Sequence, residues 1–373
     1  MSVILKLVGE VCNLDCSYCY EKRKPYEGAR TLDPEDLRQL FINIPDTMFA
    51  IELHGGEPLL YSKRRFLELA NLLKANQHRV ARVTIQTNGT LLSEEWLAFL
   101  SEKFPTLQIG ISCDGPEVHD EYRQDYQSRP SLDRVESAFR LCERERVNIG
   151  VICVVTRSSL GRSAAIAEYF SRWKCIKAVK LVPCFDYTGS QQPGTRRREE
   201  LSHLIYSSAS EMLPWAVTAE EYTNFLKEFS RAWQASYFGS YLLEPDISII
   251  RKLHSAPVNH CHYTSKKCGH VLTLYPDGNV GACDELCKGD IGLAQATEFN
   301  LDIFTKNVMA FSMDETMSML QNACNQCDYF SVCGGGCIAT RRRLAEHGRE
   351  WEYCQHRIAT IANISKTTEV EPC

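Results

Sequence analysis

Three cysteines near the start of the chain have a spacing that suits metal-cluster chemistry. Cys12, Cys16 and Cys19 lie in the stretch CNLDCSYCY, in the pattern C-x3-C-x2-C. A structural zinc ion takes four protein ligands, and a disulfide joins two cysteines. Three thiolates can instead hold three irons of a [4Fe–4S] cluster and leave the fourth iron open to a small molecule.

A second group of cysteines, toward the C-terminal end, is large enough for two sites of four ligands. Two zinc sites and two iron–sulfur clusters both agree with this number. The eight cysteines are Cys261, Cys268, Cys283, Cys324, Cys327, Cys333, Cys337 and Cys354. Cys287 and Cys373 are left over, and Cys287 is close enough in sequence to be a rival ligand or a reactive thiol.

The composition limits the classes of function and the cellular compartment. The 373 residues carry a net charge of −5, so there is no general basic field to attract nucleic acid. No run of about 18 apolar residues is present, and the N-terminal apolar stretch is too short for a signal peptide, which predicts a cytoplasmic protein without a membrane segment. Because disulfides are rare in the cytosol, clustered cysteines among the 18 favour metal or redox chemistry. Five scattered cysteines are interpreted as small buried hydrophobes: Cys113, Cys142, Cys153, Cys175 and Cys184.

The first half of the chain alternates between two hydrophobic periods. Six short, mostly β-branched runs are predicted strands: 2–8, 48–54, 81–87, 107–112, 148–155 and 177–183. Five helical patterns separate them: 34–44, 63–76, 94–103, 133–145 and 162–173. This alternation is typical of a parallel α/β sheet or barrel, in which ligands bind at the C-terminal ends of the strands.

Polar, glycine-containing turns follow the first four predicted strands. They read GEVCNLDC, HGGEP, TNGT and SCDGP in chain order. The C-terminal ends of parallel strands share one edge of a sheet, so these turns are expected to meet there, with the cysteine triplet among them.

The later part of the chain changes character twice. A polar stretch begins at 186, and a helix follows in which Thr218 and Glu221 form a capping box and an apolar face packs against the core. From about 255 onward the elements are short and rich in cysteine. We therefore predict a domain at 1–217, a linker helix region at 218–254 and a cysteine-rich domain at 255–373.

These motifs together resemble the radical S-adenosylmethionine (SAM) superfamily. The triplet with Tyr18 before its last cysteine, the GGE of HGGEP, TNG and SCDGP occur in that superfamily's order. The C-terminal cysteine pattern resembles the SPASM auxiliary-cluster domain. The resemblance implies a partial (β/α)6 TIM-like barrel followed by that domain. It also implies cofactor contacts from Tyr18, Gly55, Gly56, Glu57, Thr87, Asn88, Ser112, Asp114 and Arg123. Glu57 would receive the amino group of SAM. Arg123 either binds the carboxylate of SAM or is a solvated loop residue. His54 either faces the pocket or packs against its neighbours.

The same resemblance implies three [4Fe–4S] clusters, SAM, and an electron donor of flavodoxin or ferredoxin type. Cys12, Cys16 and Cys19 would hold the SAM-binding cluster. The first auxiliary cluster would take Cys261, Cys268, Cys283 and Cys337. The second would take Cys324, Cys327, Cys333 and Cys354. Both auxiliary sets would then be fully ligated by protein, which favours electron transfer over substrate binding.

Over the whole chain the sequence resembles anaerobic sulfatase-maturating enzymes, in which an aspartate after a cluster cysteine is the proposed base. Here that residue is Asp284, which is otherwise a structural acid near the cluster. The family has a tyrosine where this chain has Glu21. The form CYEK, at residues 19–22, looks more like maturases of ribosomally made peptides, which install cross-links and related changes.

Three hypotheses follow for the function. The first is a radical SAM peptide maturase, and the second is formylglycine formation on a cysteine or serine of a sulfatase. The third is a non-catalytic zinc-binding module. A maturase with only eleven residues before Cys12 would need a separate leader-recognition protein, or would read the core peptide directly. The arginine runs 196–198 and 341–343 either form solvated faces or help to hold an acidic peptide.

Overall fold

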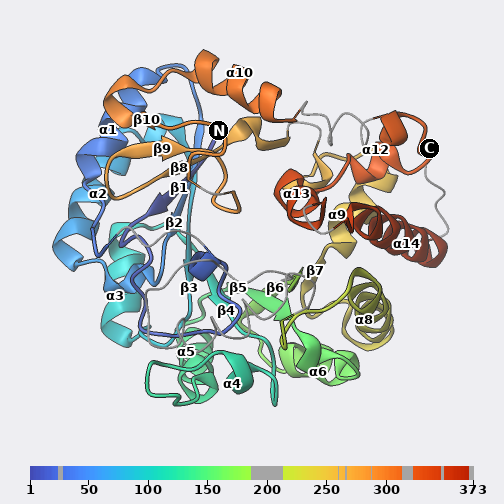
Figure 1. The fold of residues 1–373 in the computed structure, drawn as a ribbon. Coiled ribbons are helices and arrows are strands. Elements are labelled where there is room, and N and C mark those ends of the chain that lie inside the picture. The colour runs from blue at the N-terminus through green and yellow to red at the C-terminus, as the bar shows by residue number, and fades with distance from the viewer. Residues whose placement is uncertain are drawn as a thin grey trace. The chain divides into compact units, whose positions relative to one another are not determined.

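The structure is a computed structural model that describes residues 1–23, 28–185, 213–258, 260–264, 267–286, 288–312, 322–345 and 348–368 (Figure 1). Cys287, Cys373 and the arginine run 196–198 lie outside the described residues, as does most of the polar stretch that begins at 186. The chain forms two compact units that are interleaved along the sequence. The first unit comprises 1–113, 123–150 and 269–311, and the second comprises 114–122, 151–268 and 312–373. The predicted domain boundaries near 217 and 254 remain predictions.

The first unit is built on a mostly parallel sheet in the order β10-β9-β8-β1-β2-β3-β4 (Figure 1). The first four strands along the chain are β1 (Ser2–Lys6), β2 (Phe49–His54), β3 (Val80–Thr87) and β4 (Gln108–Ser112). Three later strands are β8 (Val271–Leu274), β9 (Asn279–Gly281) and β10 (Ala294–Gln295). β8 runs parallel to β1, and β9 and β10 complete an antiparallel edge. β1 therefore lies between β2 and β8, inside the sheet.

Four helices of the first unit match the predicted helical patterns to within a residue at their starts, and α10 was not predicted. The helices of this unit are α1 (Pro34–Asn43), α2 (Lys63–Ala75), α3 (Glu94–Lys103), α5 (Leu132–Arg144) and α10 (Leu301–Ser312). Asp33, Ser62 and Ser93 each cap a helix by accepting a hydrogen bond from a backbone N–H of its first turn. Buried leucine and phenylalanine side chains on one face of each of α1 and α2 supply the packing that isolated helices lack.

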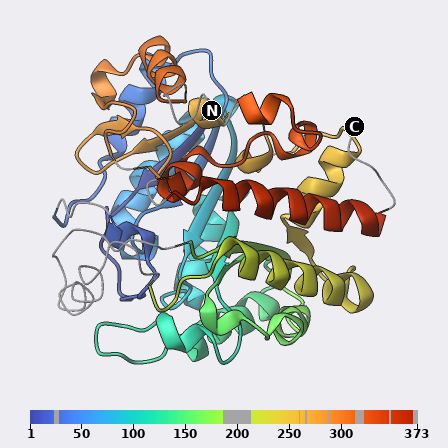
Figure 2. The same ribbon diagram turned by 45° about the vertical axis from the view of Figure 1, so that its right-hand side comes forward.

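The second unit contains strands in the order β5-β6-β7. Its helices include the long C-terminal helix that Figure 2 draws in dark red. The strands are β5 (Ile149–Val155, which starts in the first unit), β6 (Ile176–Pro183) and β7 (Leu242–Glu244). The helices are α4 (His119–Tyr122), α6 (Ser163–Ser171), α8 (Ala219–Ala232), α9 (Asp246–Leu253), α12 (Phe330–Cys333), α13 (Ile338–Ala345) and α14 (Glu350–Thr368). Helix α14 packs against α8, and Thr223 Oγ1 lies 2.7 Å from His356 Nδ1 across this contact.

The capping box predicted for α8 is confirmed. Glu221 N donates to Thr218 Oγ1 at 3.1 Å, and Thr218 N donates to Glu221 Oε2 at 2.8 Å. The predicted apolar face is buried, as expected for a packing helix: Tyr222, Phe225, Leu226, Phe229 and Trp233.

The predicted α/β fold is confirmed, including the six strands and the five helices between them. All five scattered cysteines are buried, as their interpretation as small hydrophobes requires. Among the described residues, no helix has the length and apolar character needed to cross a bilayer.

Candidate active site

Two glycines after β2 allow the cysteine loop to pass close to the sheet. Gly55 and Gly56 have φ values of +93° and +33°, a region that favours glycine. A Cβ on Gly56 would lie 1.9 Å from the backbone oxygen of Val11. Glu57 N donates to that same oxygen at 2.9 Å. The glycine pair therefore fixes Glu57 beside the loop that carries Cys12.

Glu57 is fully buried and holds three hydrogen bonds. Its Oε1 accepts from Thr87 Oγ1 at 2.7 Å and from Leu59 N at 2.9 Å, and its Oε2 accepts from Asn88 N at 2.7 Å. Burial raises the pKa of Glu57, while these donors and the charge of Arg123 lower it. A carboxylate offers about four lone-pair sites, so one site remains for a further donor such as an amino group.

The TNG turn connects Glu57 to the first cysteine. Asn88 Nδ2 donates to Asn13 Oδ1 at 2.9 Å and lies 3.6 Å from Cys12 Sγ. Burial raises the pKa of the Cys12 thiol, and the nearby charges of Glu57 and Cys16 raise it further. Such a gathering of anionic groups suits a cationic iron centre, because bound metal deprotonates a coordinating thiol. These residues therefore fit the expected cluster and its SAM ligand.

Three other predicted SAM contacts are divided between the two units: Arg123 and Ser112 belong to the first and Asp114 to the second. Arg123 is buried and donates from NH1 to Tyr18 Oη at 2.9 Å, so the alternative of a solvated loop arginine is wrong. Ser112, at the end of β4, accepts from Gln86 Nε2 at 3.0 Å. Asp114 belongs to the second unit, where its carboxylate accepts from Val154 N at 2.9 Å.

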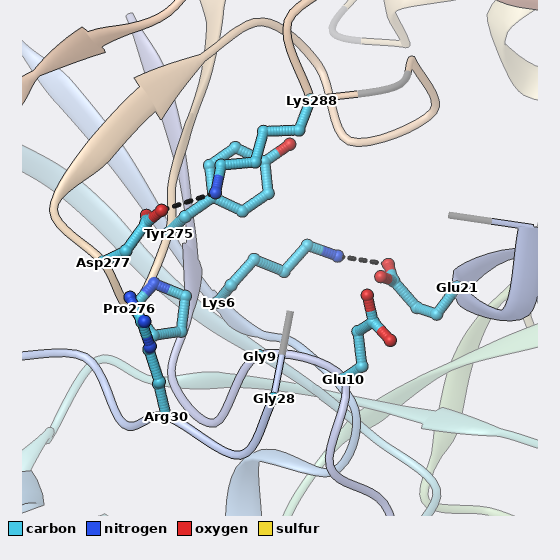
Figure 3. Close-up of a pocket in the computed structure, with 10 residues that line it drawn as sticks. All are labelled: Lys6, Gly9, Glu10, Glu21, Gly28, Arg30, Tyr275, Pro276, Asp277 and Lys288. Carbon is cyan, nitrogen blue, oxygen red and sulfur yellow. Dashed lines mark hydrogen bonds and ion pairs between the residues drawn. The ribbon is translucent and has the colours of Figure 1, made fainter. Parts of the chain in front are cut away.

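A second buried group in the first unit surrounds a lysine that the sequence interpretation missed (Figure 3). Lys6 is 1% exposed, and its Nζ lies 2.5 Å from Glu21 Oε1, the contact that Figure 3 draws. The same Nζ lies 2.9 Å from Asp284 Oδ2. Tyr20 donates its hydroxyl to the same Asp284 oxygen at 2.6 Å. The signal was available, because a lysine interrupts the apolar strand SVILKLV. We call Lys6, Tyr20, Glu21 and Asp284 the Lys6 group.

The protonation states of the Lys6 group follow from its burial and charges. Burial acts to lower the pKa of Lys6, but Asp284 and Glu21 outweigh it and raise that pKa above its ordinary value. Burial, followed by the charges of Asp284 and Glu21, raises the pKa of Tyr20 well above its ordinary value. Burial and the charge of Lys6 lower the pKa of neighbouring His54, whose Nδ1 accepts from Gly55 N at 2.7 Å. The Lys6 group thus contains a charged lysine and a neutral tyrosine. The histidine beside it, His54, is neutral.

A pocket opens beside the Lys6 group (Figure 3). It has an empty volume of about 520 Å³, part of it open to solvent. Lys6 and Glu21 line it together with charged and aromatic side chains that include Glu10, Arg30, Tyr275, Asp277 and Lys288. Lys288 Nζ lies 2.5 Å from Asp277 Oδ2 and 5.1 Å from the centre of the Tyr275 ring. Both lysines of the pocket are therefore held by carboxylates.

The two predicted auxiliary sets of cysteines differ in how they are distributed over the two units. Cys324 lies within electrostatic range of Cys327, Cys333 and Cys354, the other members of the second set, and all four belong to the second unit. That these four hold one cluster remains a prediction. The first set is divided, because Cys283 belongs to the first unit and Cys261, Cys268 and Cys337 to the second. Its assignment to one cluster therefore remains a prediction.

Within the described part of the chain, no three histidine, cysteine or acidic side chains are grouped as a single metal ion would need. Cysteines that bind different irons of one cluster need not converge on a single point. This observation therefore concerns sites for a single metal ion and not sites for a multi-iron cluster.

The comparisons with known proteins agree with the motifs. Residues 7–162 match the profile of the radical SAM superfamily. The chain is 27% identical, over 91% of its length and 83% of the relative's, to a serine-type anaerobic sulfatase-maturating enzyme from Bacteroides thetaiotaomicron. It is 25% identical, over 95% of its length and 94% of the relative's, to a cysteine-type enzyme of this name from Clostridium perfringens.

Solved structures extend the likeness to the whole fold. The structure titled "Native anSMEcpe with bound AdoMet and Cp18Cys peptide" superposes with a TM-score of 0.77 at 22% identity, covering 98% of this chain and 99% of that one. The crystal structure of Streptococcus suis SuiB has a TM-score of 0.56 at 14% identity, covering 92% of this chain and 74% of that one.

Residues 7–162 match the radical SAM superfamily, and the fold and the site agree with a radical SAM enzyme. Over nearly its whole length the chain resembles the anaerobic sulfatase-maturating enzymes, with their SPASM-type C-terminal region. The superfamily match implies SAM and a [4Fe–4S] cluster. The alternative of a non-catalytic zinc module is therefore wrong. The assignment of Cys12, Cys16 and Cys19 to that cluster remains a prediction.

Proposed function

We propose that this enzyme oxidises a side chain of a peptide or protein substrate. Its whole-chain relatives are named for the maturation of sulfatases, and one similar structure was solved with a peptide bound. The observation that carries the proposal is the buried Lys6 group. It brings a carboxylate from the C-terminal half, Asp284, beside the loop that follows the cysteine triplet.

The residues around Glu57 would hold the cofactors. Cys12, Cys16 and Cys19 would ligate the cluster, and the remaining lone-pair site on Glu57 would accept from the amino group of SAM. Arg123 would bind the SAM carboxylate, since its guanidinium presents several donors in a fixed plane. When bound, these cofactors supply a 5′-deoxyadenosyl radical that removes a hydrogen atom from the substrate.

Asp284 would take the proton that this oxidation releases. Lys6 and Tyr20 both donate to Oδ2, which fixes the orientation of the carboxylate and favours its ionised form. The substrate thus loses one hydrogen atom to the radical, one proton to Asp284 and one electron to an acceptor. We propose that the acceptor is an auxiliary iron–sulfur cluster, in one of the two sets predicted above.

Two reactions remain as candidates for the substrate's side chain. The names of the relatives favour oxidation of a cysteine or serine to formylglycine. Glu21 favours the second candidate, another modification of a ribosomally made peptide, because it introduces a carboxylate where sulfatase-maturating enzymes carry a tyrosine. Tyr20 brings a hydroxyl to Asp284 from the neighbouring position, so the departure still leaves a tyrosine in the group.

An electron donor of flavodoxin or ferredoxin type would supply the reducing electron. For the second candidate, a separate leader-recognition protein is a proposed partner.

The test is anaerobic incubation of the reconstituted enzyme with SAM and peptides that contain a sulfatase-type cysteine or serine. Mass spectrometry with a hydrazide label would detect an aldehyde, which distinguishes formylglycine from a cross-link. Cys16→Ala is the control, and it should abolish deoxyadenosine formation. Persisting SAM cleavage in that variant would contradict the assignment of the triplet. Absence of any oxidised product with sulfatase peptides and candidate precursor peptides would reject the proposed function.

A further inference from the structure

Two arginines of the second unit are buried beside the second set of cysteines. Arg341 comes from α13 and is 2% exposed, and Arg357 comes from α14 and is 4% exposed. Arginine side chains are almost never buried to this extent unless they are paired. Their partners therefore indicate what the site contains.

Both guanidinium groups donate to cysteine sulfurs. Arg341 NH1 lies 3.0 Å from Cys354 Sγ, and Arg357 Nε lies 3.0 Å from Cys333 Sγ. Backbone carbonyls accept several of their other hydrogens: Arg341 Nε donates to Gly335 O, and Arg357 NH2 donates to Cys333 O at 2.9 Å. These bonds fix the planes of both side chains relative to the sulfurs.

Among the described residues, aromatic rings lie beside the two arginines. Arg357 lies 4.2 Å from the centre of the Tyr263 ring, and Arg341 lies 5.3 Å from that of Tyr353. Among the described residues, no carboxylate forms an ion pair with either guanidinium, whereas the exposed arginines of the same unit commonly do, as Arg172 does with Glu168. Buried charges without a counter-charge are costly, so the thiolates are the available counter-charge.

The other three cysteines of the second set, Cys327, Cys333 and Cys354, lie within electrostatic range of Cys324, as does Arg341. An iron–sulfur cluster with four thiolate ligands is anionic overall, and it gains one more negative charge when it is reduced. Hydrogen bonds to the sulfurs, together with net charge, are among the factors that set the reduction potential of such a cluster.

We propose that Arg341 and Arg357 raise the reduction potential of the iron–sulfur cluster held by Cys324, Cys327, Cys333 and Cys354. Their positive charges and N–H···S bonds stabilise the reduced form more than the oxidised form. This cluster is thereby made an acceptor for the electron that leaves the substrate. This role rests on the auxiliary cluster proposed above. It adds the two residues that set the reduction potential of that cluster.

For its first residue, the geometry contradicts both interpretations of the 341–343 run. Arg341 is buried against a sulfur, so it is neither part of a solvated face nor available to hold an acidic peptide.

The experiment is an anaerobic redox titration, followed by electron paramagnetic resonance, on the reconstituted full-length protein. A Cys12→Ala/Cys16→Ala/Cys19→Ala background removes the SAM-binding cluster, so that the auxiliary clusters alone give the signal. Arg341→Gln and Arg357→Gln are compared with Lys366→Gln, which removes one positive charge from an exposed position on α14. Each arginine variant should lower the potential of the same cluster. The equilibrium constant for its reduction should fall at least tenfold, which corresponds to about 59 mV for one electron. Lys366→Gln should leave the potential unchanged.

Iron content separates the possible failures. The background protein should bind roughly eight irons for two cubane clusters. If the four cysteines bind no cluster there, the proposed cofactor is wrong, and the tuning role with it. If eight irons are present and the potential does not change in either variant, the tuning role alone is overturned. If one glutamine variant loses the cluster, the other decides. A lowered potential in that variant supports the role, and an unchanged potential overturns it.

Discussion

The Lys6 group in the first unit and the arginine pair in the second are both buried and charged, but with opposite surpluses. Around Lys6, one cation meets two carboxylates, Glu21 and Asp284. Around Arg341 and Arg357, two cations meet cysteine sulfurs and no carboxylate of the described residues. A buried surplus of charge points to the partner that the working enzyme adds. A carboxylate surplus suits acceptance of a proton, and a guanidinium surplus suits an anionic cluster.

The largest effect is expected when the carboxylate that is proposed to accept the proton is removed. Asp284→Asn should lower product formation by roughly 10²–10⁴-fold, the usual contribution of a general base. SAM cleavage should continue without product, because the residues around Glu57 are untouched. Product is measured by mass spectrometry and deoxyadenosine by chromatography. Product formation at the wild-type rate would reject Asp284 as the base.

Removing the cation from the Lys6 group should destabilise the protein. Lys6→Met leaves Glu21 and Asp284 buried without their partner, which typically costs about 3–5 kcal/mol. Urea unfolding under anaerobic conditions measures the change.

The matched control for that variant is Lys63→Met. Lys63 pairs with the exposed Glu95 and should contribute at most about 1 kcal/mol. The double variant Lys6→Met/Glu21→Gln should recover part of the loss. If Lys6→Met were no more harmful than the control, the buried pairs would not have the strength assumed here.

Asp246 extends the comparison, because it is a fully buried carboxyl that forms no ion pair with a cation of the described residues. Burial raises its pKa to about 7 from an ordinary value of 3.8. The unfolded chain therefore releases the proton at lower pH than the folded protein does, so stability falls as pH rises from about 4 and levels off above about 7. The fall is at most about 4 kcal/mol at 1.36 kcal/mol per pKa unit.

The measurement for Asp246 is the pH dependence of unfolding. Asp246→Asn should flatten the dependence between pH 4 and 7, while Asp302→Asn, an exposed change in the first unit, should leave it as in the wild type. Equal slopes in the wild type and Asp246→Asn would contradict the raised pKa.

The smallest effect is expected from Glu21. Glu21→Gln keeps a hydrogen-bond acceptor for Lys6 and leaves the Lys6–Asp284 pair intact, so stability should change by about 1 kcal/mol. Product yield should fall less than tenfold if Asp284 is the base. A loss as large as that of Asp284→Asn would assign the proton to Glu21 instead.

Local patterns predicted much of the fold and part of the site. The β-branched runs, the capping box at Thr218 and the GGE glycines are each read within a few residues, and each is found in the structure. The order of the motifs also indicated that Glu57 and the TNG turn would lie near the cysteine triplet. Such signals are local because propensity, capping and backbone strain are local.

Long-range pairings were beyond that reasoning. Lys6 and Asp284 are 278 residues apart, and only the position of β8 beside β1 brings their segments together. Arg341 belongs to a run of three arginines that looks like a solvated face, and the burial of one member depends on how α13 and α14 pack. Composition does not distinguish a buried cation from an exposed one.

The placement of β1 has a consequence for synthesis on the ribosome. β1 and β2 leave the ribosome early, but β8, the other neighbour of β1, follows roughly 200 residues later, about 10–40 s at 5–20 residues per second. Throughout that interval the nascent sheet exposes a free edge at β1, a hazard for wrong pairing between chains. Glu21 is made soon after Lys6, so the lysine has an anionic neighbour at that edge long before Asp284 exists.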